Sequence, residues 1–247
     1  MDALQSNKNQ SSKHSSDTTF FFSLTVLITA IVFSGFISNW IVNPDNLGRM
    51  TIWIGLHGAF SATWYLVLIN QIRLSKSHNM NVHRLIGKLS ALLVGAIVIS
   101  GLVMTFDLYE RLVGFGVFNP DDPSARIRAG GLIGSTVLQW GIFAVVFTLG
   151  IIYRHKPAHH KRFMLASAIQ MMPEGINRLI HLLALPGYTL LVIVFLIYVS
   201  LMIYDWKVNR RLHSSSVISF SLFVLLATSI YTLFRSQFWG DWVVSVL

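Results

Sequence analysis

The sequence predicts an all-α fold, a bundle of seven transmembrane helices, and three observations lead to this prediction. Of the 247 residues, 53% are hydrophobic and only 12% are charged, whereas soluble domains carry about 25% charged residues. Seven apolar stretches are each long enough to cross a hydrocarbon core, which requires about 20 residues. The lysines gather in the N-terminal tail and in connections that a seven-helix topology places on one side of the membrane.

The predicted spans follow one another with mostly short connections. A segment at 43–48 rich in Pro, Gly and Asn forms the first connection, and a tight turn at 184–187 makes the fifth and sixth spans antiparallel neighbours. The longest connection, residues 107–128, is predicted to be a loop over the outer face. The spans are 19–42, 50–73, 84–106, 129–153, 161–184, 187–206 and 215–235. They leave no room for a soluble domain, so we predict one membrane domain over residues 19–247.

The region before the first span is polar. Residues 1–18 are rich in Ser, Asn, Gln and Lys, a composition that buries too little apolar surface to fold alone, so we predict a disordered cytoplasmic tail. The first span is too long for the hydrophobic region of a signal peptide and lacks an A-x-A cleavage site. We therefore expect this span to be retained as a membrane helix.

The charge distribution predicts the orientation of the bundle. The net charge is +9, and the basic cluster at 154–162 and the basic run at 207–211 fall on the same side as the tail. The opposite side carries the acidic residues between positions 107 and 122. This positive-inside pattern predicts a cell-membrane protein with its N-terminus in the cytoplasm and its C-terminus outside. We expect contact with the lipid bilayer and its anionic headgroups, and no nucleic-acid partner.

The chain contains no cysteine. Disulfides, thiolate metal sites, iron–sulfur clusters and covalent attachment of haem through a CxxCH motif are therefore excluded. Any haem would be of the b type, held without a covalent bond to the chain.

The fifth predicted span carries polar residues along one face. They recur mostly at steps of three and four residues, which places them on one side of a helix. The stripe consists of Ser167, Gln170, Glu174, Asn177, Arg178 and His181. Glu174 is the only acidic residue well inside a long apolar run. Because ionisable groups at membrane depth usually face a bundle interior or a wet cavity, we predict that this stripe lines a functional site.

Residues predicted to lie at similar depths in the membrane, near its outer face, form an outer group of candidates. At the helical rise per residue, His57 lies about 10 Å below the outer face, close to the level of Glu174, with His181 nearer the outer end. His57 and His181 are predicted to ligate a b-type haem, with Arg178 pairing a propionate. The same two histidines, with Glu174, are alternatively ligands of a Zn or Cu ion. Glu174 is alternatively a general acid or base that Arg178 and Gln170 assist, or a structural partner of Arg178.

His83 and His160 form an inner group at the cytoplasmic face. They lie roughly 20 Å or more from the outer group, so no single metal ion joins the two groups. They are predicted to ligate a second haem, with Arg84, Lys161 or Arg162 near its propionates. The alternative is that these helix starts are interfacial anchors that bind lipid phosphate.

Several of these residues also match a family pattern. The matching residues are His57, Gln71, His83, Arg84, Gly87, Trp140, His160, Lys161, Arg162, Met164 and Arg178. They resemble an uncharacterised family of bacterial multi-pass membrane proteins with the pattern His…HRxxG…HRRxM…Arg, over about residues 50–185. The chain departs from it at Lys161 and at the Pro-Glu pair 173–174. The resemblance implies a bundle in a bacterial inner membrane and no particular activity. More loosely, the paired histidines are similar to cytochrome b561-type dihaem proteins.

The first functional prediction is an integral membrane redox or electron-transfer protein. It would bind b-type haem through His57 with His181, and through His83 with His160. The second is an intramembrane enzyme acting on an apolar isoprenoid, quinone or lipid, with Glu174 as its acid or base. The third is a non-catalytic transporter, sensor or assembly subunit with a membrane-protein partner.

Overall fold

The computed structural model describes residues 2–48 and 50–247, with side chains for residues 17–45, 48 and 50–247. All regular elements in this part of the chain are helices, which confirms the all-α prediction. The elements are α1 (Asp2–Val42), α2 (Asp45–Gly48), α3 (Ile52–Lys76), α4 (Met80–Gly114), α5 (Pro123–Ile152), α6 (Pro157–Gln170), α7 (Pro173–Leu182), α8 (Thr189–Asn209), α9 (Ser214–Tyr231), the 3-10 helix η1 (Leu233–Arg235) and α10 (Gln237–Val246). Six described helices, α1, α3, α4, α5, α8 and α9 with η1, are long and apolar enough to cross a membrane. This is the architecture of a multi-pass membrane protein.

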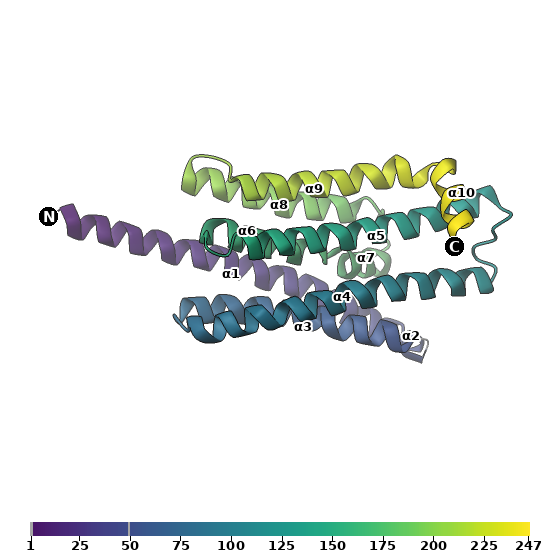
Figure 1. Cartoon of the computed structure of the whole chain (residues 1–247), viewed down its shortest axis with the longest axis horizontal. Helices are drawn as coiled ribbons and strands as arrows, with labels where there is room; N and C mark the ends of the chain where they lie inside the picture. Colours follow the sequence, from purple (N-terminus) through teal and green to yellow (C-terminus); the bar gives the residue numbers. More distant parts are fainter. Residues whose placement is uncertain (1, 49) are drawn as a thin grey trace.

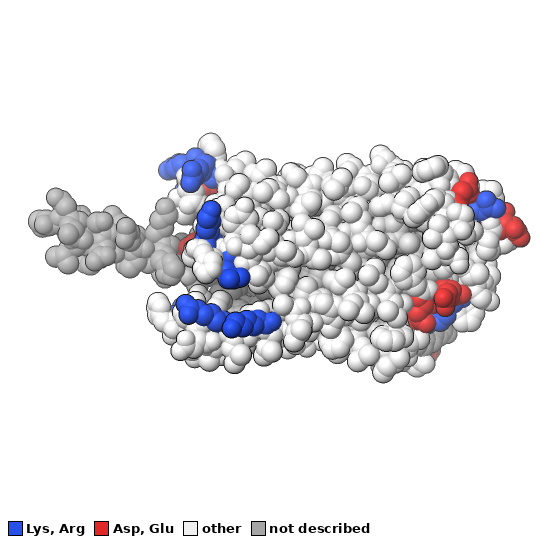
Figure 2. Space-filling view, in the orientation of Figure 1, with Lys and Arg blue, Asp and Glu red and all other residues white. Residues whose placement is uncertain are grey.

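The long helices lie side by side along one axis, and the short helices α2 and α10 lie toward the end opposite the N-terminus (Figure 1). α3 packs on α1 and α4, and α5 packs on α4, α6, α9 and α10. On the face shown in Figure 2, Lys and Arg gather at one end and most Asp and Glu at the other. We call the end at which α4 and α6 begin the basic end, and the end at which α5 begins the acidic end.

The predicted outer loop, residues 107–128, is mostly helical, so that prediction is wrong. α4 runs on past the predicted span, and only residues 115–122 connect it to α5. Asp107 and Arg111 lie one turn apart on α4 and form an ion pair at 3.0 Å. Pro123 occupies the first turn of α5, where its missing N–H is not needed. Hydropathy detects only the part of a helix that lies in hydrocarbon, and these charged extensions project beyond it.

The predicted fifth span is not one helix. α6 ends at Gln170 and α7 begins at Pro173. Proline breaks the helix here because it has no backbone N–H and its ring clashes with the carbonyl of the preceding turn. The break frees backbone carbonyls in the core, and two side chains satisfy them. The Tyr65 hydroxyl donates to the carbonyl of Ala168 at 3.0 Å, and the Gln139 amide donates to the carbonyl of Gln170 at 3.1 Å. Since backbone groups within a membrane need such partners, α3 and α5 stabilise the break.

α7 is an amphipathic helix whose apolar side packs on α1 and α8. Its buried residues are Gly175, Ile176 and Ile180. Its exposed residues include Glu174, Asn177 and His181. The expectation that the whole polar stripe faces the bundle interior is therefore wrong. The two halves of the stripe belong to different helices, and the short second helix turns its apolar face inward.

α1 and α7 cross at two glycines. A Cβ on Gly35 would overlap the carbonyl of Gly175, and a Cβ on Gly175 would lie 2.6 Å from Cα of Val32. We expect Gly35→Ala to lower the melting temperature of the detergent-purified protein, because such overpacking costs about 1–3 kcal/mol. The control is Gly95→Ala in α4, where a Cβ would meet nothing within 4 Å. Equal melting temperatures for the two variants would contradict this account of the crossing.

The predicted disordered tail, residues 1–18, falls largely on residues 1–16, whose side chains lie outside the described part of the chain. Asp17 belongs to the bundle, because it pairs with Lys161 of α6 and accepts a hydrogen bond from the Tyr204 hydroxyl at 2.8 Å. The predicted tail boundary is therefore too late. The sequence could not indicate this, because an acidic residue in a polar segment is usually solvated and the partners of Asp17 lie far away in the sequence.

Candidate functional site

The two inner histidines meet at the basic end. His83 lies in the first turn of α4 and His160 in the first turn of α6. Their ring centroids are 6.4 Å apart and their planes are inclined at 73°. Two imidazoles on opposite sides of one metal ion, with bonds of about 2.0–2.1 Å each, have centroids roughly 6 Å apart. The fold therefore brings His83 and His160 together at a separation suited to a shared ion.

Backbone carbonyls orient both rings. Nδ1 of His83 lies 3.3 Å from the carbonyl oxygen of Gln71, and Nδ1 of His160 lies 2.8 Å from that of Gly150. A carbonyl oxygen can only accept, so each Nδ1 carries the proton and each Nε2 presents a lone pair. Metal-ligating histidines are commonly held in this way, with the other ring nitrogen donating to a carbonyl. In both rings, Nε2 is therefore the nitrogen left free to act as a ligand.

The HRxxG motif positions the first histidine. Gln71 Nε2 donates to the carbonyl of His83 at 3.1 Å, while the Gln71 carbonyl holds the His83 ring. Gly87 lies one turn further along α4, where a Cβ would be 3.7 Å from Gln71 Nε2. Gln71, His83 and Gly87 thus belong to one contact between the end of α3 and the start of α4.

Gly150 has the matching role for the second histidine. Its carbonyl accepts from His160, and a Cβ on this glycine would overlap the Met164 methyl group and lie 3.4 Å from Cβ of Phe163. Gly150 therefore allows α6 to approach α5 closely. Sequence reasoning missed this residue, because a glycine in an apolar helix is ordinarily a packing residue.

The arginine of the second motif forms a buried ion pair, so its predicted contact with a propionate or lipid phosphate is wrong. Arg162 is 2% exposed and pairs with Asp205 of α8, which is 0% exposed. Asp205 also accepts a hydrogen bond from the Ser216 hydroxyl of α9 at 2.6 Å. The Arg162–Asp205 pair therefore joins α6 and α8, and Asp205 links them to α9.

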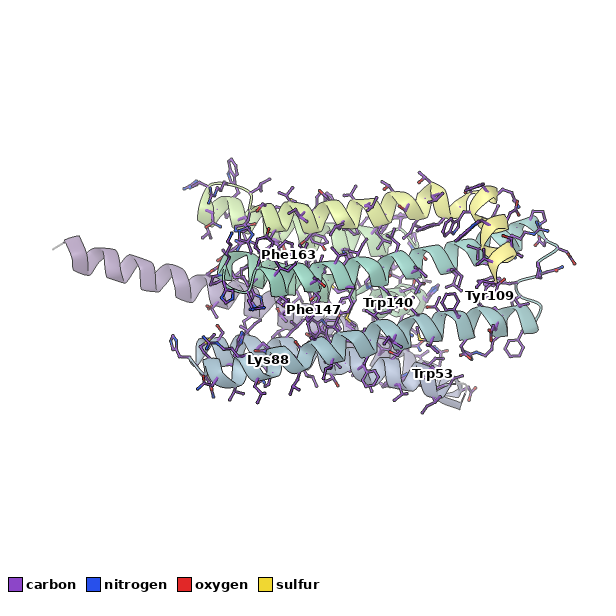
Figure 3. The ribbon with its side chains drawn as sticks, in the orientation of Figure 1. Trp53, Lys88, Tyr109, Trp140, Phe147 and Phe163 are labelled. Carbon is purple, nitrogen blue, oxygen red and sulfur yellow. The ribbon has the colours of Figure 1, made fainter. Side chains whose placement is uncertain are left out.

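The other basic residues predicted near a haem differ in their surroundings. Lys161 pairs with Asp17, so its charge is already compensated. Arg84 directly follows His83 in the chain and is exposed. Lys88, labelled in Figure 3, is exposed one turn further along α4. Arg84 is the member of this group that presents charge to an anionic partner, and Lys88, which was not predicted near a haem, adds a second exposed charge.

The outer histidines do not meet. His57 is buried where α3 faces α4 and α5, with Nδ1 3.1 Å from Ser100 Oγ and Nε2 3.3 Å from Ser61 Oγ. Its ring packs edge-on against Trp140 at 4.9 Å. His181 is exposed on α7, which packs on α1 and α8. The predicted haem or metal pair of His57 and His181 is therefore not assembled, because similar depth does not place two residues on facing helix surfaces.

The predicted catalytic group is divided in the same way. Gln170 is buried in α6 and donates to the Tyr198 hydroxyl at 3.3 Å. Glu174 and Arg178 form an ion pair at 3.5 Å, in which the Glu174 side chain is 52% exposed. The Arg178 guanidinium also lies over the Phe36 ring at 4.0 Å. Glu174, Arg178 and Gln170 thus form no common acid–base site, and the structural ion pair is the interpretation that agrees with the geometry.

A second histidine pair at the basic end becomes visible only in the structure. The rings of His159 and His213 are 4.4 Å apart, and Nδ1 of His159 lies 2.7 Å from Ser215 Oγ. Nδ1 of His213 caps α9 by accepting the backbone N–H of Ser215. Burial, followed by the positive charge of Arg162, lowers the pKa of His213 to about 4. The one sequence signal is the position of His213 just before a helix start.

The lowered pKa of His213 predicts sensitivity to acid. The unfolded chain binds a proton here near pH 6.5 and the folded chain only near pH 4, so stability is lost as the pH falls through this interval. We expect the melting temperature to drop between about pH 7.5 and about pH 5. His213→Asn keeps an N-cap without a titrating group and should reduce the drop. An equal drop in both proteins would contradict the assignment.

Comparison with protein-family models, curated proteins and solved structures found no match. Among residues 17–45, 48 and 50–247, whose side chains the structure describes, no three or more His, Asp or Glu side chains are grouped so as to hold a metal ion. The candidate site is therefore the two-histidine site at the basic end, and the case for it rests on geometry.

Proposed function

We propose that this protein is a membrane electron-transfer protein in which His83 and His160 would hold a b-type haem. The observation that supports the proposal is the histidine pair itself. Two imidazoles from separate helices lie 6.4 Å apart, and each is held through Nδ1 by a backbone carbonyl. Two carbonyl-held histidines on separate helices support a non-covalently held haem as the bound group.

The surrounding residues fit such a group. Two neutral imidazole nitrogens suit iron, and Arg84 and Lys88, exposed on the same helix as His83, offer positive charge for propionates. Bound there, haem would supply one-electron redox chemistry. The chain itself would hold the two rings through the carbonyls of Gln71 and Gly150.

We infer seven crossings, with α6 and α7 together making the fifth. α6 begins at the basic end, and α8 returns to it, since Asp205 near the end of α8 pairs with Arg162 near the start of α6. The positive-inside rule then places the basic end and the N-terminus in the cytoplasm, and the C-terminus outside. Such a topology suits an inner-membrane protein of the bacterial family that the sequence resembles, with its haem site near the cytoplasmic face.

An absorption spectrum of the detergent-purified protein, oxidised and then reduced with dithionite, tests the proposal. A Soret band that shifts on reduction, with sharp α and β bands, is the expected result for a six-coordinate bis-histidine haem. A protein that is colourless, and stays colourless after haem is added, would refute it.

A further inference from the structure

The polar side of α7 lies at membrane depth. Gly175 packs against Val32 of α1, and the Arg178 guanidinium lies over the Phe36 ring of the same helix. Both α1 residues belong to the membrane span Asp17–Val42. The helix rises about 9 Å from Phe36 to the end of this span. The polar side chains near Arg178 are therefore at the level of hydrocarbon and not of the aqueous phase beyond α1.

These side chains point out of the bundle. We call Glu174, Asn177, Arg178 and His181 the α7 polar face. Three of them are exposed, and the Arg178 side chain is 32% exposed. On α1 and α8, the helices on which α7 packs, the exposed large side chains include Leu27 and Leu196, as a lipid-facing surface requires. Because polar and ionisable groups within a membrane usually face protein or a wet cavity, the α7 polar face needs a partner that covers it.

The charges on this face compensate each other. Arg178 pairs with Glu174 at 3.5 Å and also donates to the Glu174 carbonyl at 2.7 Å. Asn177 lies between them in the chain, is exposed, and has no hydrogen-bond partner among the side chains that the structure describes. Its amide offers two donors and one acceptor oxygen. The partner that complements this face therefore carries no net charge and supplies both an acceptor and a donor.

We propose that the α7 polar face is the contact between two copies of this chain, with the two Asn177 amides hydrogen-bonded to each other. Both copies have the same orientation in the membrane, so their two-fold axis runs along the membrane normal and residues of equal depth face each other. A carboxylate or a guanidinium on that axis would meet its own charge, whereas an amide both donates to and accepts from its copy. Asparagine side chains pair membrane helices in this way. This dimer goes beyond the proposed function and does not depend on haem.

Disulfide cross-linking tests whether the two Asn177 positions meet. The chain has no cysteine, so Asn177→Cys carries a single thiol. We expect copper phenanthroline to convert this variant, in native membranes, into a covalent dimer, because a disulfide forms only between Cα atoms within about 7 Å. The matched control is Leu92→Cys on α4, where the side chain is 74% exposed and the helix packs on α3 and α5, away from α7. The control should remain monomeric.

Energy transfer between dye-labelled copies of the full-length protein in phosphatidylcholine vesicles measures the strength of the dimer. For the wild-type protein we expect transfer to rise and saturate as the protein-to-lipid ratio increases. Asn177→Leu should weaken dimerisation roughly tenfold, the loss of about one hydrogen-bonded contact between membrane helices. Asn177→Gln keeps the amide and should dimerise nearly as well as the wild-type protein.

Equal cross-linking of the two cysteine variants would overturn the proposal, and so would equal dimerisation of Asn177→Leu and the wild-type protein. A wild-type protein that stays monomeric at every protein-to-lipid ratio would also overturn it, since water or lipid headgroups would then cover the α7 polar face. This last measurement does not depend on the folding of any variant.

Discussion

Replacing His160 with alanine should abolish the six-coordinate haem spectrum of the purified protein. The substitution removes one of the two Nε2 ligands and the N–H donor to the carbonyl of Gly150. Because His83 alone leaves the iron one ligand short, we expect loss of haem or conversion to a high-spin spectrum. His83→Ala should have the same effect. The measurement is the reduced-minus-oxidised difference spectrum per mole of protein.

Two comparisons separate ligation from a structural effect. Imidazole added to His160→Ala should restore the six-coordinate bands if the ring acts as a ligand, whereas a collapsed bundle would not respond. His181→Ala should leave the spectrum unchanged, because this side chain is exposed on α7. A full loss of haem in His181→Ala, with His160→Ala unaffected, would contradict the proposal and indicate that the outer histidines are the ligands.

Replacing Arg162 with methionine should destabilise the protein severely. Asp205, at 0% exposure, would keep only the Ser216 hydroxyl as a partner for its charge. Breaking a buried ion pair by removing one partner typically costs about 3–5 kcal/mol. For a chain of this size that corresponds to a fall in melting temperature on the order of 10 °C. Thermal unfolding in detergent, followed by circular dichroism, measures it.

The double variant Arg162→Met with Asp205→Leu is the informative control. Replacing a whole buried pair by apolar residues is often neutral or stabilising, so the double variant should melt at a higher temperature than the single one. Arg84→Met, at an exposed position on the same end, should change the melting temperature little. A single Arg162 variant as stable as Arg84→Met would show that the ion pair contributes little.

The fold class could be predicted from the sequence because each long apolar run must satisfy its backbone internally, and only a helix does this locally. Two features of the fold could not be predicted in this way. The helical extensions around residues 107–128 carry charges, so hydropathy does not detect them. The break before Pro173 lies in an apolar run, and it is tolerated because Tyr65 and Gln139 reach the freed carbonyls from other helices.

The candidate site could be predicted only in part. The HRxxG and HKRxM segments named His83 and His160, and helix rise correctly separated them from the outer group. Depth alone could not pair the outer residues, because His57 faces α4 and α5 whereas His181 is exposed on α7. The sequence also could not identify Arg162 as the partner of Asp205, which lies 43 positions away.

The sequence by itself determined properties that each helix expresses alone: the helical class, the apolar spans, the opposite charge of the two ends, and the absence of thiol ligands. Tertiary structure decided which helix faces meet, and with them the pairing of His83 with His160, the burial of Arg162 and the exposure of Glu174. The physical reason is that hydropathy and helical period are local quantities. Facing residues are set by close packing between helices, through contacts such as Gly35 with Gly175 and Gly150 with Met164.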